Sequence, residues 1–169
     1  MIPFLLRKPL QSKIQIRLAP NVIDPAPTAE ETISEPSEYE VMRTNSIAKM
    51  NRAIQSKLEK VISYTKQTMV AYMSEEDLNR LYAYIVEYSS GDTLQKISPV
   101  KVDSQLKSID IMHFGWNIGK AFGRKRVHTA TFIKNVFAHT LRDLEISTIE
   151  HKMSHTESVC HIKLNGNLS

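Results

Sequence analysis

Cationic side chains gather in one short stretch of this chain, and the chemistry that they can perform is the recognition of an anion. Residues 109–141 carry five Lys and Arg residues against one acidic residue, an excess equal to the net charge of +4 of the whole chain. Cations at a duplex surface neutralise phosphates, and the N-terminus of a helix adds backbone N–H donors. The sequence therefore predicts a nucleic-acid-binding site made of Lys120, Arg124, Lys125, Arg126, His128, Thr129 and Lys134. The alternative interpretation is a solvated basic turn that aids solubility.

Histidines near the C-terminus have a spacing that could hold a metal ion. His151 and His155 lie four residues apart on an expected helix, and Cys160 and His161 follow. Two imidazoles at that spacing can share a zinc ion with a thiolate. A metalloprotease helix, however, needs Glu directly after the first His, where this chain has Lys152, and structural zinc usually draws on two or more Cys. We therefore predict no metal site and no cofactor.

Catalytic patterns are missing from the sequence. It contains no Gly-rich phosphate loop, no GxSxG and no HExxH. Cys160 and His161 are neighbours in sequence, but adjacency alone does not place a thiolate beside its base. The acidic run Glu75, Glu76 and Asp77 is explained by the preference for acids in the first turn of a helix. We predict that the protein is not an enzyme, and we identify no small-molecule substrate.

Helical periodicity begins at Thr44. Apolar residues recur there every three or four positions, at Ile47, Met50, Ile54, Leu58, Val61, Met69 and Tyr72. This pattern predicts a long amphipathic helix capped by Asn45 or Ser46. Ser74 then caps a second helix, which Gly91 ends, and the two helices are expected to form an antiparallel hairpin.

Two further helices are expected around the basic turn. Asp110 caps the first helix, Gly123 ends it, and His128 or Thr129 starts the second. Gly115 and Gly119 place a groove on the first helix, which permits close approach by another helix. The small residue and the turn glycine resemble a helix-turn-helix.

A capping box at Ser147 predicts a last short helix that ends near His155. The fold class is thus mainly α: a helical hairpin plus a three-helix, helix-turn-helix-like unit.

The predicted domain organisation is a flexible N-terminal arm at 1–43, a helical domain at 44–158 and a short C-terminal strand or tail at 159–169. The arm is acidic and rich in Pro, and such composition buries little apolar area. A linker with a short strand or turn is expected around 94–102, where Pro99 disfavours a helix. One cysteine and no apolar run near the ~20 residues of a membrane helix indicate a cytoplasmic protein without a membrane partner.

The stretch from Asp110 to Met153 resembles small uncharacterised proteins of anaerobic gut bacteria. The similar pieces are His-Phe-Gly-Trp-Asn-Ile, Phe-Ile-Lys-x-Val-Phe and the closing Glu-x-x-Thr-Ile turn. The resemblance covers about a quarter of the chain. It implies a bacterial helical domain and transfers no binding or catalytic residue.

The favoured hypothesis is a non-enzymatic accessory or regulatory protein that binds nucleic acid through the basic turn. The alternative is a protein–protein interaction module or a subunit of an assembly. In that alternative, the partner or a second subunit contacts the long helix or the grooved face at Gly115 and Gly119.

Overall fold

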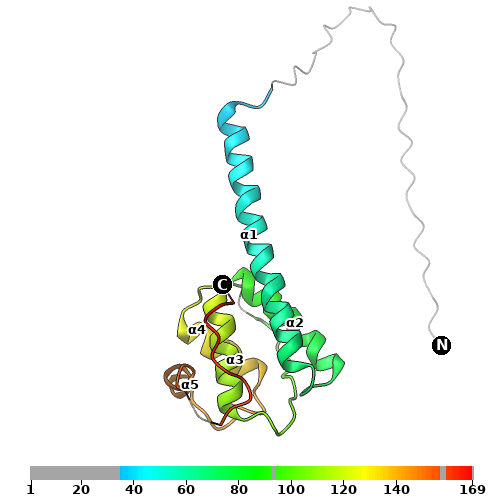
Figure 1. Cartoon of the computed structure of the whole chain (residues 1–169), viewed down its shortest axis with the longest axis vertical. Coiled ribbons are helices and arrows are strands. Elements are labelled where there is room, and N and C mark those ends of the chain that lie inside the picture. The colour runs from blue at the N-terminus through cyan, green and yellow to red at the C-terminus, as the bar shows by residue number, and fades with distance from the viewer. Residues whose placement is uncertain (1–34, 93, 157–158, 169) are drawn as a thin grey trace, which may run out of the picture. The chain divides into compact units, whose positions relative to one another are not determined.

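Helices make up most of the protein. The computed structural model describes residues 35–92, 94–156 and 159–168, and the chain divides into the units Met1–Glu35 and Pro36–Ser169. Within the described residues there are five helices and no strand, so the predicted mainly α fold is confirmed (Figure 1). They are α1 Glu38–Met69, α2 Glu75–Ser90, α3 Ser108–Ala121, α4 Arg126–Val136 and α5 Ile146–Lys152. None of these helices is long and apolar enough to cross a lipid bilayer.

Helix α1 starts earlier than the periodicity predicted. A capping box sets its first turn: the Ser37 hydroxyl accepts the Glu40 N–H at 3.3 Å, and the Glu40 carboxylate accepts the Ser37 N–H at 2.9 Å. These reciprocal bonds satisfy donors that a helix end leaves open. The predicted caps Asn45 and Ser46 are therefore wrong, and residues 38–43 are helix rather than arm. The rest of the predicted arm, residues 1–34, lies outside the described residues.

The predicted hairpin of α1 and α2 is confirmed, because α2 packs against the C-terminal half of α1 (Figure 1). The Ser74 hydroxyl accepts the Asp77 N–H, and Gly91 ends α2 in the left-handed conformation at φ 88°. Burial acts to raise the pKa of the Asp77 carboxyl, but hydrogen bonds from Ser74 and Arg80 outweigh it and lower that pKa.

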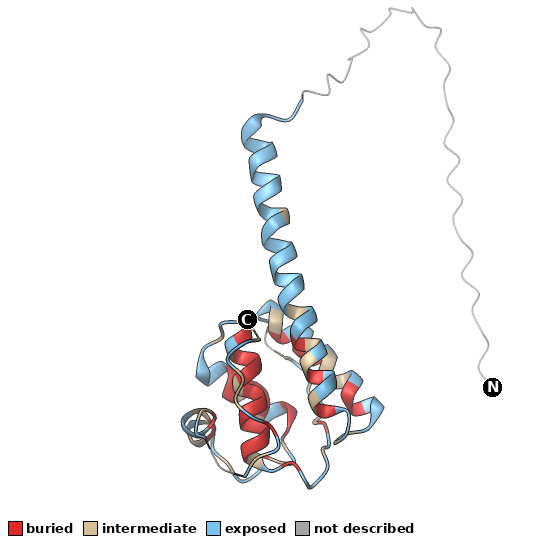
Figure 2. Cartoon of the chain, viewed as in Figure 1, coloured by how far each residue is buried: buried red, intermediate tan, exposed pale blue. Residues whose placement is uncertain are grey.

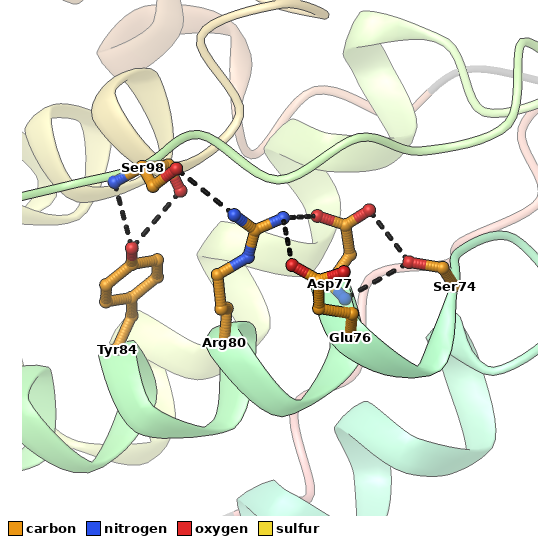
Figure 3. Close-up of polar contacts among 6 residues, drawn as sticks. All are labelled: Ser74, Glu76, Asp77, Arg80, Tyr84 and Ser98. Atoms are coloured by element: carbon orange, nitrogen blue, oxygen red, sulfur yellow. Dashed lines mark hydrogen bonds and ion pairs between the residues drawn. The ribbon is translucent and has the colours of Figure 1, made fainter.

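A polar cluster ties the start of α2 to the linker that follows it (Figure 3). The Arg80 guanidinium pairs with Asp77 and donates to the Ser98 hydroxyl at 3.1 Å. The Tyr84 hydroxyl accepts the Ser98 N–H at 2.9 Å and donates to the Ser98 carbonyl at 3.1 Å. The sequence predicts a short strand or turn around 94–102, and of these two alternatives the strand is not formed. Side chains and single backbone bonds such as Val100 N–H to Val136 O at 2.9 Å hold this linker instead.

Helices α3 and α4 pack closely through the two glycines of α3. A Cβ atom at Gly115 would lie 2.6 Å from Ile133, and one at Gly119 would overlap the Thr129 side chain. The expected groove exists, but the chain's own α4 fills it. The prediction that this grooved face pairs with another subunit is therefore wrong.

The C-terminal segment is neither strand nor loose tail in its described part, 159–168. Buried polar groups of α3 hold it instead. Asp110 accepts the backbone N–H groups of His161 at 2.6 Å and Ile162 at 2.9 Å. Asn117 accepts the Asn165 N–H at 2.7 Å and donates to the Lys163 carbonyl at 2.9 Å. These bonds place Ile162 in the hydrophobic core, where it is buried.

Three predicted helix starts are shifted by a few residues. Asp110 lies in the first turn of α3, where it accepts the Lys107 N–H, and is not its cap. Helix α4 begins at Arg126 rather than at His128 or Thr129. Helix α5 begins at Ile146 without a side-chain cap bond, so the predicted capping box at Ser147 is not formed.

Candidate functional site

The basic turn joins α3 to α4, as predicted, and its glycine has the left-handed conformation that the turn requires. Gly123 has φ 64°, and the Arg124 N–H donates to the Gly119 carbonyl at 2.8 Å. Lys120, Lys125, Arg126 and His128 are exposed. Arg124, Arg126, Thr129 and Lys134 have hydrogen-bond partners within the molecule, and these partners determine what each of them can do.

Arg124 caps the C-terminus of α2. Its Nη2 donates to the Ser89 carbonyl at 2.6 Å, one residue before the end of the helix. Its guanidinium carbon lies 5.9 Å from the centre of the Tyr88 ring. A cation beside the last carbonyls of a helix is stabilised by the helix dipole. Arg124 is half-buried and thus serves the α2–α4 packing.

Arg126 caps the C-terminus of α5 in the same way. Its guanidinium donates to the Glu150 carbonyl, to the His151 carbonyl at 3.3 Å and to the Ser154 hydroxyl at 3.2 Å. It also lies 5.2 Å from the centre of the Trp116 ring. The indole is half-buried.

Lys134 and Thr129 are also engaged by the fold. The Lys134 ammonium donates to the carbonyls of Leu141 at 2.7 Å and Arg142 at 2.9 Å, in the turn after α4. Thr129 is buried in the α3–α4 contact and bonds the Tyr88 hydroxyl at 2.7 Å. Burial raises the pKa of that phenol, which keeps it protonated. The prediction that Thr129 contacts nucleic acid is therefore wrong, because Gly119 leaves room for its side chain inside the fold.

Part of the predicted site does meet at one shallow depression. Lys120, Arg124 and Arg126 line it together with the Trp116 indole and with Gly119, Gly123 and Thr129. Lys125, His128 and Lys134 do not line it. The depression thus holds three cations and one aromatic ring, but both arginines are already bonded to carbonyl groups.

The histidine set does not assemble into a metal site. In the described part of the chain no three His, Cys, Asp or Glu side chains are placed to hold one ion. His113 is a buried packing residue, with its ring nitrogens 2.7 Å from the carbonyl oxygens of Ile162 and His155.

A second surface lies on α1. The apolar face of this helix is buried at Val61 and Met69, yet the same face is open to solvent nearer the N-terminus. Ile47, Met50 and Ile54 are 45%, 58% and 50% exposed. Figure 2 shows this first part of α1 exposed along almost all of its length. We call residues 38–57 the open half of α1.

The periodicity of α1 contained the signal for this surface. The spacing of the apolar residues predicts the stripe, but no local pattern indicates that its first half meets no other part of the described fold. No family model, no curated protein and no solved structure matches this chain. We therefore infer the function from the geometry of the two surfaces, the basic turn and the open half of α1.

Proposed function

We propose that the protein is a non-enzymatic protein-interaction module whose binding surface is the open half of α1. The observation that carries this proposal is the row of exposed Ile47, Met50 and Ile54 on the face that is buried farther along the same helix. A cytoplasmic location belongs to the same proposal and is supported by the single cysteine of the chain.

The energetics of an isolated helix support an interaction. In proteins, most of the stability of a helix comes from tertiary packing of its amphipathic face rather than from the helix propensity of its residues. The open half of α1 contains Thr44, Asn45, Ser46 and Asn51, which are weak helix formers. Burying its apolar face against a partner would stabilise the segment as helix.

The distribution of residue types around α1 supports one-sided binding. Lys49, Arg52 and Ser56 lie on the side of the helix opposite Ile47 and Ile54, and all three are exposed. One face therefore offers apolar contact and the other keeps the helix hydrated. This arrangement is typical of a helix that docks into a partner's apolar groove or pairs with another helix.

Site-specific photo-crosslinking tests the proposal in cells that express the full chain. A photoreactive amino acid at Met50 should crosslink to protein, whereas the same group at Ser56, on the opposite face, should crosslink much less. Crosslinked protein of either kind, another copy or a different chain, counts as a partner. Equal yields from the two positions, or no protein product from Met50, would contradict the proposal.

Nucleic-acid binding is a second candidate, favoured by the depression that Lys120, Arg124 and Arg126 share with Trp116. Its test uses two exposed cations, Lys120 and Lys125, whose side chains donate to no carbonyl in the described structure. The double variant Lys120→Glu and Lys125→Glu should fold normally and lose any salt-dependent mobility shift with duplex DNA or RNA. An unchanged shift, or no shift for the unmodified protein at low salt, would exclude this role.

A further inference from the structure

We propose that the partner of the open half of α1 is the same segment of a second copy of this chain, in antiparallel orientation. The inference rests on the proposed function, because it names the occupant of the surface defined above. Three properties of the segment support it: the spacing of its residues, the sign of their charges and its length.

The spacing is that of a two-stranded coiled coil. Residues separated alternately by three and four positions lie along one side of the open half: Glu40, Arg43, Ile47, Met50, Ile54 and Lys57. This alternation is the heptad pattern of core positions, in which each side chain fits between side chains of the facing helix. Ile47, Met50 and Ile54 are apolar, two charged residues precede them and one charged residue follows them.

Those end charges select the orientation. In a parallel pair each core residue faces its own equivalent, so Glu40, Arg43 and Lys57 would each meet a like charge. In an antiparallel pair with Ile47 opposite Met50, Glu40 of each copy meets Lys57 of the other. Arg43 then lies opposite Ile54, which its aliphatic stem can cover while the guanidinium reaches water. Antiparallel pairing thus replaces three like-charge contacts by two attractive ones.

The length of the segment fits the same register. With Ile47 opposite Met50, the first helical residue, Glu38, lies at the same level along the axis as Glu59 of the other copy, and neither acid occupies a core position. Val61, two residues farther along, is already buried by its own chain. The overlap therefore uses the exposed part of each helix, about 33 Å at 1.5 Å per residue, and stops where each α1 enters its own core.

Sedimentation equilibrium of the purified full chain tests the pairing. We expect a reversible monomer–dimer equilibrium, which Met50→Glu shifts to monomer. Ser56→Glu adds the same charge on the opposite face and should leave the dimer unchanged. Because Met50 is exposed in the single chain, both variants should keep the thermal unfolding midpoint of the dilute protein.

Charge reversal tests the orientation. In the antiparallel pair Lys57→Glu turns two attractive contacts into repulsive ones and should weaken the dimer about 10-fold. Lys49→Glu, with the same change of charge on the outer face, should have little effect. Adding Glu40→Lys to Lys57→Glu restores opposite charges and should recover affinity relative to Lys57→Glu alone, although Glu40 also caps α1.

Separate results overturn the inference and the proposed function. A protein that stays monomeric up to about 100 μM, where any micromolar complex is formed, excludes self-pairing. The proposed function stands in that case if Met50 still crosslinks to a different protein. A dimer that Lys57→Glu leaves unchanged excludes the antiparallel orientation, and a dimer that Met50→Glu leaves unchanged excludes α1 as its interface.

Discussion

Charged side chains usually face solvent and apolar side chains are usually buried, but the basic turn and the open half of α1 depart from this pattern. Arg124, Arg126 and Lys134 donate to backbone carbonyls of their own chain. Ile47 and Met50, by contrast, are about half exposed. The most basic stretch of the chain thus largely stabilises the fold, whereas an apolar stretch of α1 lies on the surface.

This contrast shows that a cationic side chain can donate hydrogen bonds to the open carbonyls at a helix end of its own chain. Each of the three cations donates to carbonyls at a helix end or in a turn, namely at the ends of α2 and α5 and in the turn after α4, where the Leu141 carbonyl also accepts the Leu144 N–H. A protein with short helices has many such ends. A basic cluster is then evidence for binding only to the extent that its cations lack partners of this kind.

The largest expected effect compares two methionines on one face of α1. Met69→Ala should destabilise the fold by about 2–5 kcal/mol, because Met69 is completely buried and the substitution leaves a cavity. Met50→Ala should change the folding free energy by less than about 0.5 kcal/mol, because Met50 is exposed in the single chain. Urea unfolding of dilute protein measures both. Similar losses from the two variants would show that the open half is part of the folded core.

A smaller effect is expected at the contact that positions the basic turn. Gly119→Ala forces its new methyl group into Thr129, which should cost about 1–3 kcal/mol, less up to about 1 kcal/mol gained in helix propensity. Adding Thr129→Ala removes the clashing atoms. The double variant should therefore be more stable than the sum of the two single effects predicts. Strict additivity in thermal unfolding would mean that α3 and α4 are not in this contact.

The smallest effect compares neighbours within the turn. Arg124→Ala should lower stability by about 1 kcal/mol, since the C-terminal carbonyls of α2 lose their cation. Lys125→Ala, at an exposed side chain, should stay within about 0.5 kcal/mol of the unmodified protein. Equal effects in chemical denaturation would argue against Arg124 as a helix cap.

Local signals in the sequence predicted part of the candidate site. The helices on both sides of the basic turn follow from apolar spacing, and the turn itself follows from Gly123. The partners of the cations could not be predicted, because Ser89 is 35 residues from Arg124 and Glu150 is 24 residues from Arg126. Every residue has a backbone carbonyl, so the residue type does not indicate which carbonyl will accept a hydrogen bond from a given cation.

The helical class, the hairpin of α1 and α2, and the close approach at the α3 glycines all follow from local sequence patterns. Periodicity, caps and small residues act over a few neighbouring positions, and they can be found without knowing the fold. Long-range packing, in contrast, sets three other features: α4 fills the glycine groove, Asp110 and Asn117 hold the C-terminal segment, and α1 is buried along one half. Those outcomes depend on which distant segments meet, because burial is a property of the assembled core and not of the residue that is buried.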